Sequence, residues 1–223
     1  MHAEELKAWR KSERQRLLAA RAALDARAVE GYRCRIDAHL ERAFPGLKTS
    51  TFAFCWPIRN EYDARHLAKT LREAGALTAL PVVVAPRSPL AFREWHPGVE
   101  LARGPLDIPY PADSKELVPQ AVLLPMNGWD AQGYRLGYGG GFFDRTLASL
   151  ADKPLAIGVS YELARLPTIH PQAWDIPVDY LVTERGVYRR DPEGLAFLGA
   201  PQAGDDPSSL SSPVCYAGDI KSH

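Results

Sequence analysis

Short, almost continuously apolar runs, separated by longer polar or helical stretches, constrain most strongly what this chain can fold into. Such runs are typical of strands buried on both faces of a sheet that helices cover. They are TSTFAFC (49–55), ALPVVVA (79–85), QAVLLP (120–125), LAIGVSY (155–161) and DYLVT (179–183). We predict an α/β fold, a mostly parallel sheet with helices on both faces in three layers. A single domain should span residues 1–198, followed by a disordered tail at 199–223, which is rich in Gly, Ser and Pro.

The stretches between these runs predict the helices. Residues 3–43 contain no proline and are dominated by Ala, Leu, Arg and Glu, so the amino-terminus should be helical, with Gly31 separating two helices. An amphipathic helix is predicted over 63–75, and a further helix follows the glycine-rich segment, from about Phe142 to Leu150. Residues 86–119 are rich in proline and alternate in short segments, which predicts an irregular, partly β insertion.

Composition limits the class of protein. Among 223 residues, 27 Lys and Arg balance 27 Asp and Glu, so no overall field favours nucleic acid or a membrane as partner. No apolar run approaches the roughly 20 residues that span a bilayer. Cys34, Cys55 and Cys215 form no C-x-x-C pair, which suits free thiols, acting as small apolar residues, in a reducing cytoplasm. The sequence leaves the oligomeric state open.

The segment RLGYGGGFFDR (135–145) carries the strongest functional signal. It lies between a predicted strand and a predicted helix, where free N–H groups and glycines without side chains suit a phosphate. Arg135 and Arg145 flank the turn, and Asp144 falls in the first helical turn, where it could hold Mg²⁺ against phosphates. The alternative is a turn that merely packs the helix on the sheet. Neither the P-loop nor the dinucleotide-binding pattern fits.

The longer segment LLPMNGWDAQGYRLGYGGGFFDRTL (123–147) resembles the signature of the 5-formyltetrahydrofolate cyclo-ligases, also called 5,10-methenyltetrahydrofolate synthetases. FCWPIRNEYD (54–63), DIPYP (107–111) and WDIPVDYLVT (174–183) resemble further segments of that family in the same order. The resemblance covers roughly residues 7–190. It implies an enzyme that uses ATP and Mg²⁺ to cyclise 5-formyltetrahydrofolate to 5,10-methenyltetrahydrofolate, with small molecules as its partners.

The resemblance also implies roles for individual residues. Arg135 and Arg145 would be catalytic, Asp144 and Asp175 would hold Mg²⁺, and Trp56 and Glu61 would contact the folate. The implied ATP-binding residues are Lys11, Arg14, Arg135, Leu136, Gly137, Tyr138, Gly139, Gly140, Gly141, Phe142, Phe143 and Asp144.

The basic amino-terminal segment allows two placements of the K-x-x-L-R element that reaches the nucleotide in this family. Lys7 could pair with Arg10, or Lys11 with Arg14. The second placement is preferred because the residues that follow Arg14 keep the family's spacing, although Glu13 stands where the family usually has leucine. A solvated basic helix face remains the alternative for each of these residues.

Simpler readings stay open at several positions. Asp175 could be a turn aspartate before a proline, Glu61 a solvated residue leading a helix, and Trp56 a core residue. Trp129 is predicted to be core, and Tyr138 is a candidate neighbour of the nucleotide. For the whole chain, the alternatives are an ATP-dependent enzyme with another pterin-like or amide substrate, and a nucleotide-binding regulatory protein without catalysis.

Overall fold

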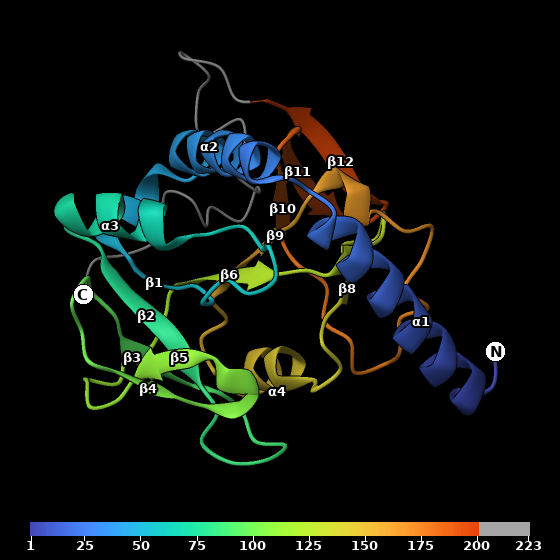
Figure 1. The fold of residues 1–223 in the computed structure, drawn as a ribbon, viewed down its shortest axis with the longest axis horizontal. Coiled ribbons are helices and arrows are strands. Elements are labelled where there is room, and N and C mark those ends of the chain that lie inside the picture. Colours follow the sequence, from blue (N-terminus) through green and yellow to red (C-terminus); the bar gives the residue numbers. More distant parts are fainter. Residues whose placement is uncertain (201–223) are drawn as a thin grey trace.

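The computed structural model describes residues 1–200, and an eight-stranded sheet forms their centre (Figure 1). Its strands are β1 (Thr51–Ala53), β2 (Leu77–Val82), β3 (Ala91–Glu94), β6 (Ala121–Pro125), β9 (Leu155–Val159), β10 (Tyr180–Thr183), β11 (Gly186–Asp191) and β12 (Gly194–Gly199). They lie in the order β12-β11-β10-β9-β6-β1-β2-β3. The inner strands β10, β9, β6, β1 and β2 are parallel, which confirms the predicted α/β class.

Helices cover both faces of this sheet. They are α1 (Ala3–Ala22), α2 (Ala26–Ala43), α3 (Arg65–Glu73) and α4 (Phe142–Ser149), with short 3₁₀ turns η1 (Pro45–Thr49), η2 (Pro105–Asp107) and η3 (Glu162–Ala164). In Figure 1, α2 and α3 lie above the sheet and α4 lies below it. The predicted three layers are therefore present.

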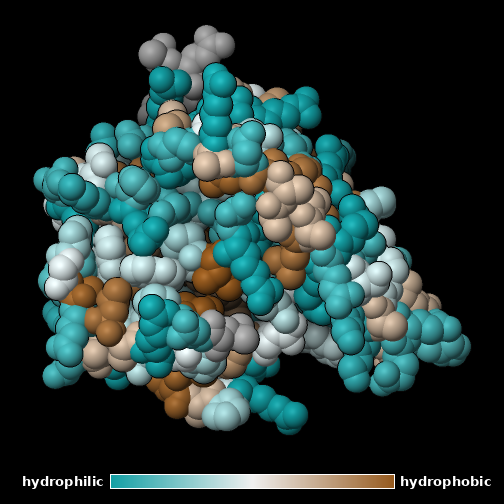
Figure 2. All heavy atoms as spheres, in the orientation of Figure 1, coloured by the Kyte–Doolittle hydropathy of each residue, from teal (hydrophilic) through white to brown (hydrophobic). Residues whose placement is uncertain are grey.

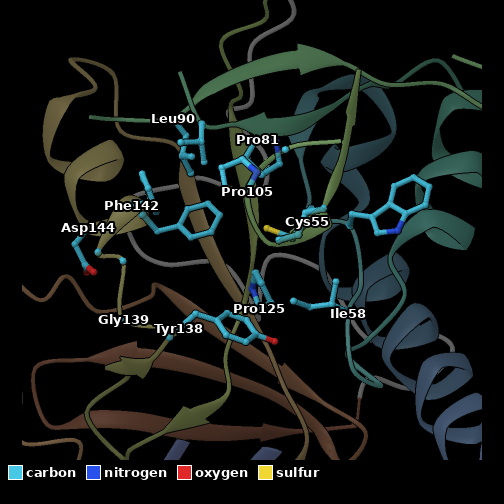
Figure 3. Close-up of a pocket in the computed structure, with 18 of the residues that line it drawn as sticks. Cys55, Ile58, Pro81, Leu90, Pro105, Pro125, Tyr138, Gly139, Phe142 and Asp144 are labelled. Carbon is cyan, nitrogen blue, oxygen red and sulfur yellow. The ribbon is translucent and has the colours of Figure 1, made fainter. Parts of the chain in front are cut away.

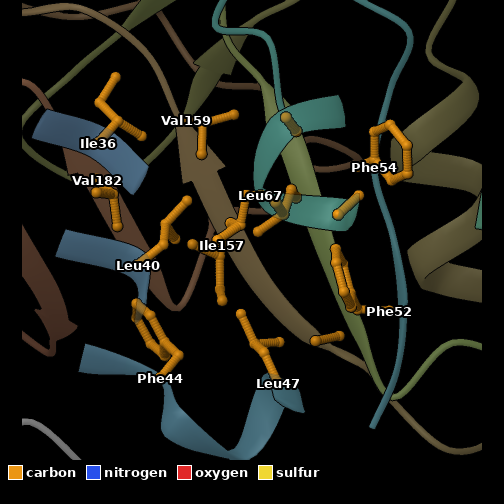
Figure 4. Close-up of a cluster of buried hydrophobic side chains, with 14 of the residues drawn as sticks. Ile36, Leu40, Phe44, Leu47, Phe52, Phe54, Leu67, Ile157, Val159 and Val182 are labelled. Carbon is orange, nitrogen blue, oxygen red and sulfur yellow. The ribbon is translucent and has the colours of Figure 1, made fainter. Parts of the chain in front are cut away.

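Two hydrophobic cores hold the layers together. On one face, Ile36 and Leu40 of α2 and Leu67 of α3 pack against Phe52 and Ile157 of the sheet (Figure 4). On the other face, Leu17 of α1 and Leu147 of α4 pack against Val122, Leu124 and Leu181. Each fully buried leucine or isoleucine contributes about 1.5–3 kcal/mol through the hydrophobic effect. The spacing of apolar residues on the helices thus sets which face each helix turns to the sheet.

The break in the helical amino-terminus is not where the sequence predicted it. Gly31 lies inside α2, and the two helices separate at residues 23–25. Asp25 caps α2 by accepting a hydrogen bond from the Ala28 N–H at 2.7 Å. A glycine inside a helix costs only about 1 kcal/mol, so one exposed glycine is a weak signal that a helix ends. A carboxylate at the N-cap is a stronger signal, because it satisfies a free N–H at the start of the helix.

The sheet edges are antiparallel, which the sequence did not indicate. β3 pairs with β2, and the β10–β11–β12 meander closes the other edge. The predicted insertion is confirmed: after β3 it forms β4 (Leu101–Arg103), η2 and β5 (Pro109–Pro111), with β4 and β5 paired in a small sheet. The disordered tail was predicted to begin at Gly199, but this residue is the last of β12. Residues 201–223 of the predicted tail lie outside the described residues.

The two described cysteines are free thiols. Cys55 is partly buried, but Cys34 is exposed on α2, so the prediction of a small apolar role is wrong for Cys34. Among the described helices, none has both the length and the apolar character needed to cross a bilayer.

The winding of the sheet reverses between β1 and β6. From β1 the chain proceeds outward to β2 and β3, and then returns to the other side of β1 to form β6, β9 and β10. Loops that follow the two central strands diverge at such a point and leave a crevice at the carboxyl ends, where open α/β sheets bind ligands. Glu61 follows β1, and the glycine loop follows β6.

Candidate ligand site at the carboxyl edge of the sheet

A cavity of about 680 Å³ opens at this reversal point. Its walls come from α1, from the loop after β1, from the insertion between Arg103 and Tyr110, and from the glycine loop with the start of α4. In Figure 2, hydrophobic side chains lie in the middle of this face among hydrophilic ones. Cys55, Pro81, Leu90, Pro105 and Phe142 form an apolar wall (Figure 3). The volume and mixed lining are those of a site for a small organic ligand.

The glycine loop is built between two short elements. β7 (Gly128–Trp129) and β8 (Arg135–Leu136) form a small hairpin, and the loop leads from β8 into α4. Gly139 has φ 96° and Gly141, the N-cap of α4, has φ 62°, so both adopt a left-handed conformation that side chains disfavour. The loop therefore presents bare main chain at a helix N-terminus, which suits an anion.

Arg135 and Asp144 form the polar centre of this wall. Arg135 Nη2 lies 2.6 Å from Asp144 Oδ1, and its Nη1 donates to the Ile176 carbonyl at 2.6 Å. The Ile176 N–H in turn donates to Asp144 Oδ1 at 3.0 Å. Burial lowers the pKa of Arg135, while the charges of Asp144 and Asp175 raise it, and a guanidinium stays charged throughout. Both predicted residues line the cavity, and Asp144 falls in the first turn of α4 as predicted.

Asp175 lines the same cavity on a separate loop. Its Oδ2 accepts from Arg10 Nη2 at 2.6 Å and from the Gln172 N–H at 2.8 Å. Asp175 is thus a turn aspartate and a cavity residue at once, so the two readings of the sequence are compatible. No group of three or more His, Cys, Asp or Glu side chains suited to a metal occurs in residues 1–200.

Arg14 of α1 lies against the glycine loop. Its Nε donates to the Gly137 carbonyl at 2.7 Å, and a Cβ built on Gly139 would lie 3.3 Å from its Cζ. Burial and the nearby charge of Arg10 lower the pKa of Arg14. Lys11, by contrast, is exposed and does not line the cavity. Arg10 and Arg14 therefore face the cavity from successive turns of α1, one residue from each predicted pair.

Arg145 lies behind the loop. Its guanidinium donates to the Gly140 carbonyl and lies over the Phe142 ring, with 5.2 Å between Cζ and the ring centroid. Arg145 is not among the residues that line the cavity, so the structure places it where it supports the loop. Leu136, Gly137, Tyr138, Gly139, Gly140, Gly141, Phe142 and Phe143 all line the cavity.

Glu61, in the segment that follows β1, lines the same cavity and is only 7 % exposed. Its Oε1 accepts from the Tyr138 hydroxyl at 2.7 Å and lies 3.4 Å from Arg21 Nη2, and its Oε2 accepts from the Ile58 N–H. Burial raises the pKa of Glu61, against the lowering effect of Arg21 and the Tyr138 hydroxyl. The reading of Glu61 as a solvated residue that leads a helix is therefore wrong.

The two tryptophans singled out in the sequence differ in position. Trp129 is fully buried, as predicted, and its indole N–H donates to the Tyr161 carbonyl. Trp56 is partly buried, follows β1 and lines the cavity, with the Arg65 guanidinium over its ring.

Sequence reasoning missed three residues that line the cavity or bond to Glu61. Arg21 is buried beside Glu61, and Arg10 was set aside in favour of Arg14. Arg10, Arg14 and Arg21 share one helix face, because spacings of four and seven residues return to the same side, and this signal was available. Trp174, 68 % exposed at the cavity beside Asp175, begins a segment that the resemblance covers, but it was not singled out as a site residue.

The fold and site together define an α/β protein with a ligand cavity at its switch point, one wall of which is suited to a polyanion. The comparisons with known proteins agree with this class. The chain belongs to the 5-formyltetrahydrofolate cyclo-ligase family, whose profile matches residues 6–184.

Individual relatives resemble the chain over most of their length. It is 32% identical over 152 residues to the 5-formyltetrahydrofolate cyclo-ligase of Escherichia coli K12, covering 65% of this chain and 83% of that protein. The Mycolicibacterium smegmatis cyclo-ligase is 32% identical over 153 residues, covering 64% and 79%. The fold is similar to that of 5,10-methenyltetrahydrofolate synthetase from Aquifex aeolicus, with a TM-score of 0.71, 27% identity and coverage of 85% and 97%.

Proposed function

We propose that this chain catalyses the ATP-dependent cyclisation of 5-formyltetrahydrofolate to 5,10-methenyltetrahydrofolate, releasing ADP and phosphate. Family membership supports the activity. The observation that carries the assignment of residues is that one cavity contains both the glycine loop with Arg14 and Arg135, and the buried carboxylate of Glu61. A polyanion and a flat ligand with an N–H edge can therefore lie side by side.

The reaction needs positioning and charge neutralisation rather than a nucleophilic side chain. The formyl oxygen attacks the γ-phosphorus, so that an O–P bond forms as the bond from phosphorus to ADP breaks, and the formyl C=O becomes a C–O–phosphate single bond with N5=C iminium character. N10 then attacks that carbon and loses its proton, the C–O bond breaks, and phosphate leaves with the formyl oxygen. In our assignment, main-chain N–H groups of the glycine loop and the charges of Arg14 and Arg135 hold the phosphates, and Glu61 accepts hydrogen bonds from the pterin N–H edge.

The donor set also fits Mg²⁺. Asp144 and Asp175 would hold the ion, since Mg²⁺ is usually bound by one or two carboxylates together with phosphate oxygens and water. The ion would neutralise charge on the phosphates. Each carboxylate accepts a hydrogen bond from an arginine, Arg135 or Arg10, so the two acids are aimed at the cavity before any metal binds. Within residues 1–200, Cys34 and Cys55 are both free thiols, which agrees with a location in the reducing cytoplasm.

The activity itself is tested by mixing the protein with MgATP and 5-formyltetrahydrofolate and following the near-ultraviolet absorbance of a methenyl product. We expect the absorbance to rise only when all components are present, in step with ADP release. Binding of ATP without any product, together with no change of melting temperature on adding 5-formyltetrahydrofolate, would instead favour another substrate on the same fold.

Replacing Asp175 by asparagine tests the metal assignment. We expect the Mg²⁺ concentration for half-maximal activity to rise by about tenfold or more, because a neutral amide is a weaker ligand than a carboxylate. Asp152→Asn, an exposed aspartate outside the cavity, is the matched control and should leave the Mg²⁺ dependence unchanged. An unchanged Mg²⁺ dependence in Asp175→Asn would remove Asp175 from the metal site.

A further inference from the structure

Tyr138 connects the two sides of the cavity. It lies between Gly137 and Gly139 in the glycine loop, and its side chain extends toward the segment that follows β1 (Figure 3). There its hydroxyl donates to Glu61 Oε1 at 2.7 Å and accepts from Arg21 Nη2 at 3.1 Å. The loop assigned to phosphates and the carboxylate assigned to the pterin are thus joined by one hydrogen bond.

The other members of this network are held by elements outside the loop. Arg21 Nε donates to the Arg59 carbonyl at 2.8 Å, and Nη1 donates to Asn127 Oδ1 at 3.0 Å. Glu61 is held by the Ile58 N–H at 3.1 Å. A buried carboxylate needs such partners, because burying its charge without hydrogen bonds is costly. Tyr138 is the network member that would move with the glycine loop.

Arg14 contacts the main chain on both sides of Tyr138. The Arg14 guanidinium bonds to the Gly137 carbonyl and lies against Gly139. An anion bound at the loop would attract Arg14 and take up hydrogen bonds from it, so both neighbours of Tyr138 would change their contacts. Such a change would be transmitted to the Tyr138 hydroxyl, and from there to Glu61.

We propose that Tyr138 is a positioning residue that couples occupancy of the glycine loop to the orientation of Glu61, so that a nucleotide and a reduced folate bind cooperatively. The inference rests on the proposed function, because it takes Glu61 as the acceptor for the pterin. Coupling of this kind is reciprocal: each ligand tightens the other by the same factor.

The charge on Glu61 supplies a second readout. The titratable and charged groups that face it are Arg21 from α1, Cys55 and Arg59 from the segment after β1, Tyr138 from the glycine loop, and Tyr161 after β9. The Tyr138 hydroxyl lowers the pKa of Glu61 by donating to its charged form. Without that donor, the pKa of Glu61 rises. As the pH is lowered, Glu61 is then protonated sooner, so the affinity for the folate should begin to fall at a higher pH than in the wild type.

The test is calorimetric titration of 5-formyltetrahydrofolate into the full chain, with and without the Mg²⁺ complex of β,γ-imido-ATP. We expect the analogue to tighten folate binding by about fivefold or more in the wild type, within the usual range of coupling between sites. In Tyr138→Phe the factor should fall below about twofold, and the acid limb of folate affinity should shift to higher pH. The matched control is Tyr134→Phe, which alters a partly buried tyrosine that packs against the core just before the loop, and it should behave as the wild type.

Each outcome bears on a different statement. Equal coupling and an unshifted acid limb in wild type and Tyr138→Phe would overturn the role of Tyr138 alone, as would a wild type that binds both ligands independently. A wild type that does not bind 5-formyltetrahydrofolate at all would overturn the proposed function and this inference with it. Equal loss of coupling in Tyr138→Phe and Tyr134→Phe would show a general effect of loop packing, and would also overturn the specific role.

Discussion

Replacing Arg135 by alanine is expected to lower turnover by about 10³-fold, the order found when a positioned cation for phosphoryl transfer is removed. Two consequences of the geometry combine in this loss. The phosphates lose a cation, and Asp144 Oδ1 loses the closer of its two hydrogen-bond donors among the described residues, at 2.6 Å, and keeps only the Ile176 N–H. The measurement is the rate of methenyl product at saturating ATP and folate.

The same substitution should also lower the free energy of unfolding. The guanidinium is buried and bonds to both a carboxylate and the Ile176 carbonyl. Breaking a fully buried pair costs about 3–5 kcal/mol, and the loss here should be smaller because the Asp144 side chain is 20% exposed. Arg135→Lys separates the two effects. It keeps the charge and much of the stability, but it loses the planar fork that reaches two acceptors, so turnover should still fall by about 10²-fold.

Arg72 offers a matched control for Arg135. Its Nη2 donates to Glu94 at 2.9 Å and its Nη1 to the Trp95 carbonyl at 3.0 Å, the same pairing of a carboxylate with a main-chain oxygen, away from the cavity. Arg72→Lys should therefore lose a similarly small part of its stability without losing turnover per folded molecule. Near-normal turnover in Arg135→Lys and Arg135→Ala would mean that the glycine loop is not the phosphate site.

Replacing Glu61 by glutamine should lower kcat/KM for the folate by about 10²-fold or more, because hydrogen bonds to a charged group contribute about 1.5–3 kcal/mol each. In the absence of folate, affinity for ATP should change by less than about twofold, since Glu61 meets the loop through the Tyr138 hydroxyl and a glutamine oxygen can still accept that hydrogen bond. A Glu61→Gln variant with weakened ATP binding and normal folate kinetics would reverse the assignment of the two sides.

The pH dependence of the wild type follows from the same residue. Glu61 must be ionised to accept hydrogen bonds from the pterin, and burial holds its pKa above the ordinary glutamate value. Activity at low folate should therefore fall as the pH decreases through that raised pKa, and this acid limb should be absent from the residual activity of Glu61→Gln. Glu94→Gln, which alters a glutamate paired with Arg72 outside the cavity, should keep the wild-type profile.

Local sequence patterns were sufficient to predict the buried strands and the glycine loop. The apolar runs became the parallel strands, and the glycine segment became a loop that leads into a helix at Phe142. The antiparallel edge strands β11 and β12 were missed because partly exposed strands lack a continuous apolar run. The helix break was misplaced because one glycine was weighted above an N-cap aspartate, Asp25.

By itself, the sequence determined the α/β class, the glycine loop with Arg135 and Asp144, and the family. Each of these can be recognised from the order of residues within one short contiguous segment or in a series of them. Only the tertiary structure decided which side chains share the cavity. Arg10 meets Asp175 across 165 residues, Tyr138 meets Glu61 across 77, and Lys11 points to solvent although it neighbours Arg10 in the chain. Such contacts depend on strand order and on the rotation of α1 about its axis, which are set by packing of the whole core, and no local spacing encodes them.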